Sequence, residues 1–130
     1  MANEITVVRD NWMELADHFR NLPMPFQQEV FLKDCHVAGT MHVDDVLIKT
    51  ADVTEGSVLS FKREPANEHD ELAIAVQNAK GERIGWVPRK HNEVFARLMD
   101  AGKLLVAKVS HKELEDHWLN LRIGIYLKEM

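Results

Sequence analysis

The sequence predicts a small, mainly β domain in which about six short strands form a mostly antiparallel barrel, accompanied by two or three helices. Three observations favour this fold class. The chain has 130 residues, 45% of them hydrophobic, which suits one compact domain with a single core. Short runs of branched and aromatic residues recur between turn residues from residue 57 onward. Helical periodicity is clear in only two segments.

The first 33 residues are predicted to form a helical extension packed on one open end of the barrel. Pro23 and Pro25 end its helix. Docking of this apolar helix on another subunit is the alternative. We therefore divide the chain into the extension, residues 1–33, and a barrel domain, residues 34–130. The apolar helix face consists of Trp12, Leu15, Ala16 and Phe19.

Residues 29–56 contain the first strand and an irregular stretch. The strand is predicted over residues 29–38, with Phe31, Cys35 and Val37 on one side. The stretch that follows is predicted to hold a short strand, a turn or a helical piece around Asp44–Lys49, and then a loop closed by Gly56.

From residue 57 onward, five more strands and one helix are predicted. Asn78–Gly81 is typical of a hairpin loop, and Pro88 precedes a helix over residues 90–101. The polar residues 111–117 are predicted to form a solvated turn. The apolar stripe of the helix holds Val94, Phe95, Leu98 and Met99. The strands are predicted over residues 58–63, 72–78, 83–87, 104–110 and 118–127.

Composition and charge restrict the classes of function. No apolar run approaches the roughly 20 residues of a membrane helix and no hydrophobic signal core is present, so we expect a cytoplasmic protein without a membrane partner. Cys35 is the single cysteine and cannot form an internal disulfide. The formal charge of −5 argues against non-specific coating of nucleic acid. Residues 57–112 nevertheless carry 10 basic against 7 acidic groups, which leaves room for one local anion site on an otherwise ordinary mixed surface.

The segment Arg63–Val76 holds an unusually polar loop between two predicted strands. Asn67 and Asp70 have short side chains that typically bond nearby backbone amides and hold a turn. A second interpretation is that they display an amide and a carboxylate toward a ligand hydroxyl, while cations from elsewhere bind the ligand's phosphate. Both interpretations can hold together.

Two runs, LSFKREPANEHDELAIAV and GERIGWVPRKHNEVFARLMDAG, resemble the HIRAN domain. The resemblance covers about residues 35–110, and Val37–His42 is similar to the opening strand of that family. The residues that carry it are Arg63-Glu64-Pro65, Asn67, Asp70, Ala73-Ile74-Ala75-Val76, Ile84-Gly85-Trp86-Val87-Pro88-Arg89 and Met99-Asp100-Ala101-Gly102.

The resemblance implies a modified OB-like barrel that captures the 3′ end of single-stranded DNA, as in eukaryotic DNA-remodelling translocases. It implies that Asn67 and Asp70 surround the terminal nucleotide, with Asp70 accepting a hydrogen bond from the free 3′ hydroxyl, and that Arg89 binds phosphate. Many bacterial and phage members stand alone. The expected role is an accessory module in DNA repair or replication, with a helicase or nuclease as partner.

This sequence departs from the family where paired aromatics stack on bases. Met41, His42 and Val43 occupy that stretch, and only His42 could stack. His69 and Trp86 are the available replacements, although Trp86 could instead pack at the barrel rim on the second helix.

Other basic residues border the predicted site. Lys90 follows Arg89 at the start of the helix, where the alternative is a solvated helix surface. Arg63 borders the polar loop, where the alternative is an ion pair with Asp70 or Glu64.

No catalytic residue, metal or cofactor is predicted. The acidic loop and a second group, His111, Glu115 and His117, lack a recognised metal-ligand spacing. Cys35 in an apolar strand is typical of a small core residue rather than a nucleophile. We therefore expect no enzyme, with hydrolysis only through a partner. A protein-interaction module without nucleic acid, and a metal-binding domain, are the alternatives.

Overall fold

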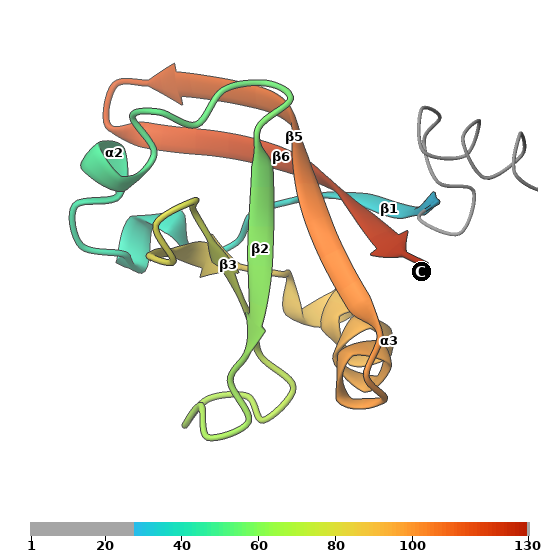
Figure 1. Ribbon diagram of the computed structural model, residues 1–130. Helices are drawn as coiled ribbons and strands as arrows, with labels where there is room; N and C mark the ends of the chain where they lie inside the picture. The colour runs from blue at the N-terminus through green and yellow to red at the C-terminus, as the bar shows by residue number, and fades with distance from the viewer. Residues whose placement is uncertain (1–27, 130) are drawn as a thin grey trace, which may run out of the picture. The chain divides into compact units, whose positions relative to one another are not determined.

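The computed structural model describes residues 28–129, which form a mainly β fold (Figure 1). The predicted helix near the N-terminus lies outside these residues, so its packing on the barrel stays a prediction. Residues 29–33, counted above with the extension, lie in the first strand. The strands are β1 (Glu29–His36), β2 (Val58–Arg63), β3 (Ile74–Gln77), β4 (Arg83–Trp86), β5 (Leu104–Glu115) and β6 (Trp118–Lys128).

All six strands belong to one antiparallel sheet in the order β1-β6-β5-β2-β3-β4. The sheet curls so that its two edges approach each other. Ala38, just after β1, forms an isolated β-bridge with Trp86 of β4. The Ala38 amide donates to the Trp86 carbonyl at 2.7 Å, and the Trp86 amide donates back at 2.8 Å. A Cβ on Gly85 would lie 2.7 Å from the Ala38 carbonyl oxygen, so this close approach requires glycine. The predicted antiparallel fold is confirmed as a curled half-barrel.

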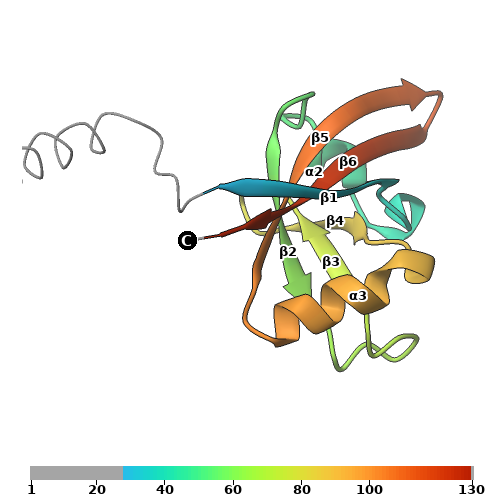
Figure 2. The ribbon, with the colours of Figure 1, turned by 90° about the vertical axis from the view of Figure 1, so that its right-hand side faces the viewer.

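The helices are the short α2 (Val46–Lys49), the longer α3 (Arg89–Asp100) and the 3-10 helix η2 (Thr40–His42). Figure 2 shows α3 at the end of the molecule opposite the tip of the β5–β6 hairpin. None of the described helices combines the length and the apolar character that crossing a lipid bilayer requires. The fully buried side chains of the core include Leu59, Ile74, Val76, Ile84, Leu121, Ile123 and Ile125.

The predicted position of Phe31 on the inner side of β1 is wrong. The pairing of β1 with β6 shifts register between Phe31 and Lys33, so the strict two-residue alternation breaks there. Phe31 is 55% exposed and packs edge-on against Tyr126, with ring centroids 5.4 Å apart. Leu32 packs against the core instead, whereas Cys35 and Val37 are buried as predicted.

Two other predictions need correction. Residues 111–117 are not a free turn, because β5 continues to Glu115 and pairs with β6 up to the pair Glu115–Trp118. Asp116, with a left-handed φ of 54°, lies in the tight turn that joins the two strands. Val94 does not belong to the inner stripe of α3, since it is 58% exposed. The inner face of α3 instead includes Asn92, which is 3% exposed, with Phe95 and Ala96.

Candidate functional site

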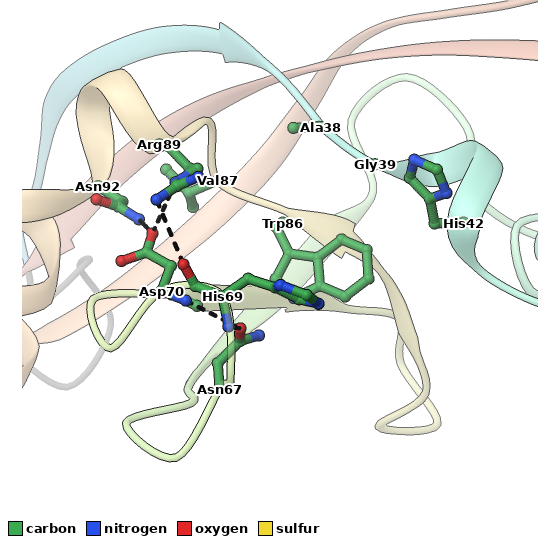
Figure 3. Close-up of a pocket in the computed structure, with 11 residues that line it drawn as sticks. Ala38, Gly39, His42, Asn67, His69, Asp70, Trp86, Val87, Arg89 and Asn92 are labelled. Carbon is green, nitrogen blue, oxygen red and sulfur yellow. Dashed lines mark hydrogen bonds and ion pairs between the residues drawn. The ribbon is translucent and has the colours of Figure 1, made fainter.

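A pocket of about 660 Å³ lies where the loop after β2, the end of β4, the start of α3 and η2 come together (Figure 3). Three separate stretches of the sequence, residues 38–42, 67–73 and 86–92, contribute to it. Six of the ten predicted site residues line this pocket: His42, Asn67, His69, Asp70, Trp86 and Arg89. The other lining residues are Ala38, Gly39, Ala73, Val87 and Asn92.

The polar loop is held in shape by its own side chains. Asn67 Oδ1 accepts hydrogen bonds from the backbone amides of His69, at 2.9 Å, and Asp70, at 3.2 Å. Asp70 Oδ1 accepts from the amide of Leu72 at 2.9 Å. The turn-holding interpretation is therefore confirmed, and it engages only one of the two carboxylate oxygens of Asp70.

The second carboxylate oxygen of Asp70 contacts side chains of α3. Oδ2 accepts a hydrogen bond from Asn92 Nδ2 at 2.7 Å and lies 3.6 Å from Arg89 Nε. The Asn92 hydrogen bond, the Leu72 amide and the charges of Arg89 and Arg63 hold the pKa of Asp70 below its usual value. Asp70 is thus an ionised hydrogen-bond acceptor at neutral pH.

Arg89 is the first residue of α3, and its side chain is 77% exposed. Besides its contact with Asp70, its Nη2 donates to the His69 carbonyl at 3.3 Å. Its other N–H groups make no hydrogen bond within residues 28–129, so the guanidinium can bind an anion without leaving Asp70. The geometry therefore joins a carboxylate and a guanidinium at one edge of the pocket.

Trp86 lines the pocket between the polar loop and η2 (Figure 3). Its indole Nε1 donates to Glu64 Oε1 at 2.9 Å, and the Arg83 guanidinium lies 4.7 Å from the ring centroid. A Cβ on Gly39 would lie 2.6 Å from Cε3 of this ring, and Gly39 has a left-handed φ of 71°. Glycine thus lets η2 approach the indole closely, and Trp86 is held in one orientation.

Glu64 connects the indole with the polar loop. Its carboxylate accepts hydrogen bonds from Trp86, from Asn67 Nδ2 at 3.2 Å and from Arg83 at 2.9 Å. Burial opposes ionisation, but these three donors outweigh it and hold the pKa of Glu64 below its usual value. Glu64 therefore orients two pocket residues at once.

Four of the predicted site residues lie outside the pocket lining. Met41, in η2, is 72% exposed, and Val43 ends that helix. Arg63 pairs with Asp100 at 2.9 Å and donates to the Ala73 carbonyl, so the alternative of an ion pair with Asp70 or Glu64 is wrong. Lys90 lines a separate depression beside α3.

Sequence analysis missed Asn92 and Glu64. Asn92 stands three and four residues before Phe95 and Ala96, so an inner helix face drawn through those two would have included it. Glu64 lies in the motif quoted for the family resemblance, but its partners Trp86 and Arg83 become neighbours only in the fold. Among residues 28–129, no three His, Cys, Asp or Glu side chains converge in a way that could hold a metal ion.

Solved structures with similar folds support the architecture. A protein from Lactobacillus plantarum is similar with a TM-score of 0.74 and 26% identity, and the match covers 79% of this chain and 98% of that one. The crystal structure of the HIRAN domain of human HLTF gives a TM-score of 0.61 and 19% identity, over 78% of this chain and 79% of that one. The NMR structure of the HLTF HIRAN domain gives 0.51 and 22%, over 78% and 80%.

Comparison at the level of sequence gives the family. None of the curated proteins matches this chain. The family model described as HIRAN domain matches residues 30–130, which include the whole pocket and every strand and helix of the described fold except Glu29, the first residue of β1. The chain therefore belongs to the HIRAN domain family.

Proposed function

We propose that this protein binds single-stranded DNA and that the pocket holds the 3′ end of the strand. The observation that carries the proposal is the pairing of the Asp70 carboxylate with the Arg89 guanidinium, 3.6 Å apart at the pocket. A terminal nucleotide presents a hydroxyl and, one sugar away, a phosphate. A carboxylate that only accepts hydrogen bonds and an exposed guanidinium that only donates them match this pair of groups.

Asp70 supplies the discrimination between ends. Its low pKa keeps it charged, so a free 3′ hydroxyl can donate to it. A 3′ phosphate would bring about −1.5 to −2 charges against the same carboxylate and would be repelled. The side chain is only 16% exposed and is held by Asn92, so it does not simply turn away.

Trp86 supplies a stacking surface for the terminal base. Stacking on an aromatic ring contributes about 1–3 kcal/mol per base. The family's paired aromatics are absent at Met41, His42 and Val43, so Trp86 is the principal ring, with His42 and His69 at the pocket. We therefore expect weaker binding than with two stacking tyrosines, but binding directed to the same place.

In this proposal the protein is a binding module rather than an enzyme. It presents a strand end during DNA repair or replication, and any cleavage or unwinding is carried out by a nuclease or helicase partner. The overall charge of −5 limits binding elsewhere on the surface, which favours recognition of an end over coating of a strand.

The test is a fluorescence anisotropy titration with short 5′-labelled strands at two ionic strengths. Strands with a free 3′ hydroxyl should bind more tightly than strands with a 3′ phosphate, and binding should weaken with salt. Asp70→Asn should reduce the preference for the hydroxyl about tenfold or more, since it removes a charge-assisted hydrogen bond and the repulsion. Glu71→Gln, an exposed carboxylate in the same loop, is the control and should keep the preference.

Arg89→Ala tests the phosphate contact. It should lower the affinity for all strands and reduce the slope of log K against log salt by about 0.7. Lys103→Ala, which removes one exposed cation outside the pocket lining, should change neither. If the wild-type protein binds strands with a 3′ hydroxyl and with a 3′ phosphate equally tightly, the proposed end recognition is wrong. A flat response to every strand would favour the protein-interaction module.

A further inference from the structure

A second depression, of about 470 Å³, runs between strand β1 and helix α3. We call it the β1–α3 groove; its lining includes Lys33 from β1 and Lys90, His91, Glu93, Val94 and Arg97 from α3. Lys90 and His91 directly follow Arg89 of the pocket, so the first turn of α3 borders both depressions. The two depressions are thus adjacent across the first turn of α3.

The two lysines give the groove its positive charge. Lys33 is exposed and stands two residues before the buried Cys35, hence on the inner side of β1 at the rim of the sheet that faces α3. Lys90 is exposed in the first turn of α3. Among the described residues, neither lysine has a carboxylate within ion-pair distance, whereas Arg97 is paired with Glu93 at 3.1 Å.

His91 lies near both lysines, in the lining of the same groove. Partial burial, followed by the charges of Lys33, Lys90 and His36, lowers the pKa of this imidazole below its usual value. These charges come from both β1 and α3, so cations from the two elements act on the same space. In a protein with a net charge of −5, such a local concentration of unpaired cations is suited to a polyanion.

We propose that the β1–α3 groove binds the phosphates of the nucleotides that precede the captured 3′ end. This inference rests on the proposed function and deepens it, because it gives the strand a direction away from the pocket. Arg89 holds the phosphate next to the end, and Lys90 and Lys33 hold those further along the strand. The exposed Val94 offers an apolar contact for a sugar or a base edge.

The length of α3 limits the number of nucleotides whose phosphates can bind along the groove. From Arg89 to Arg97 the helix rises about 12 Å at 1.5 Å per residue. With about 3.4 Å or more between successive phosphates, this length accommodates about two to four of them. Since each phosphate joins two nucleotides, the site extends over about three to five nucleotides counted from the 3′ end.

The experiment is a titration of oligothymidylates of two to eight nucleotides, each with a free 3′ hydroxyl, against the full-length wild-type protein. Because an end is bound, a longer strand offers no additional binding positions, and affinity should rise up to about five nucleotides and then level off. The double variant Lys33→Gln/Lys90→Gln should bind the dinucleotide like the wild type but lose most of the gain in affinity with increasing strand length. At 0.1 M salt this loss is about fivefold for each phosphate contact, or about 25-fold for both, taking the contribution as zero at 1 M.

The matched control is Lys80→Gln/Lys103→Gln, which removes the same charge from two exposed lysines outside both depressions. It should keep the gain with length. If the control loses as much as the groove variant, or the groove variant keeps the gain, the groove is not the path of the strand. If the wild type shows the 3′ hydroxyl preference but no gain with length, the groove inference fails and the pocket proposal stands. If the wild type binds no strand, both fail.

Discussion

The two walls of the pocket are built differently. On the wall formed by the polar loop and α3, Asn67, Asp70 and Asn92 hold one another and the backbone through hydrogen bonds of 2.7–3.2 Å. On the opposite wall, η2 is anchored by the buried Thr40 hydroxyl, 3.4 Å from the Leu119 carbonyl, and it exposes Met41 and His42. The carboxylate proposed to accept a hydrogen bond from the hydroxyl is therefore preorganised, whereas η2 offers little for stacking.

Trp86 lies between these walls and is fixed from both sides, by Glu64 and by the close approach of Gly39. The largest expected effect therefore comes from Trp86→Ala, which should weaken strand binding by about 1–3 kcal/mol, or roughly 5- to 150-fold. Trp86→Phe loses the Glu64 hydrogen bond but keeps an aromatic ring on which a base can stack, so it should retain most of the affinity. Anisotropy titrations measure both, with circular dichroism to verify the fold. Equal losses for Ala and Phe would contradict a stacking role.

Glu64→Gln tests how much the charge of Glu64 stabilises the polar loop. The substitution removes the charge that the Arg83, Trp86 and Asn67 donors stabilise, and we expect a loss of about 1 kcal/mol in the free energy of unfolding at pH 7. Since the pKa of Glu64 is lowered by folding, its contribution is present above the ordinary value of 4.5 and is lost as the pH falls through the lowered one. The difference between wild type and variant should shrink below about pH 4.5.

Urea unfolding at pH 7, 5 and 3.5 measures this difference. Glu93→Gln, an exposed carboxylate on α3, is the control and should stay within about 0.5 kcal/mol of the wild type. A Glu64→Gln loss that is independent of pH would mean that the charge of Glu64 plays no part.

Asn92→Leu tests the connection between the loop and α3. Without the 2.7 Å hydrogen bond, which is the first cause of its lowered pKa, Asp70 should titrate closer to its usual value of 3.8. NMR of the Asp70 carboxyl carbon against pH measures the shift directly, and the preference for a 3′ hydroxyl should fall by a few fold because the carboxylate is less firmly oriented. An unchanged titration of Asp70 would show that Arg89 and the Leu72 amide suffice.

Met41→Ala is expected to have the smallest effect. The side chain is 72% exposed and does not line the pocket, so both stability and strand affinity should stay within about 0.5 kcal/mol of the wild type. Thermal unfolding and the same titration check this. A tenfold loss of affinity would mean that η2 contributes to binding after all, and the difference between the walls would disappear.

The sequence predicted those parts of the fold in which local pattern and burial agree. β2 has the predicted bounds, and β6 buries Leu119, Leu121, Ile123 and Ile125 in the predicted alternation. The turn-forming role of Asn67 and Asp70 was also predictable, because each side chain bonds an amide two residues later.

Other features depend on tertiary pairing and were not predictable from local pattern. The register shift in β1 moved Phe31 outward, since a bulge interrupts the two-residue period without a distinct residue type to mark it. The outer part of β5 has no buried alternation because most of its side chains face solvent, and it is held by backbone pairing with β6 and by the Lys112 ammonium, which donates to the carbonyls of Thr50 and Val53. Arg63 pairs with Asp100, which lies 37 residues away in the sequence and comes close only through the packing of α3.

The most direct test of the central claim is a two-dimensional ¹H–¹⁵N NMR titration of the protein with a short single strand that ends in a free 3′ hydroxyl. We expect shifts of the amides of residues 67–72 and 89–92 and of the Trp86 indole. The same strand with a 3′ phosphate should produce smaller shifts at equal concentration. Shifts confined to residues outside the pocket and the β1–α3 groove, or equal shifts with both strands, would contradict recognition of a strand end by Asp70 and Arg89.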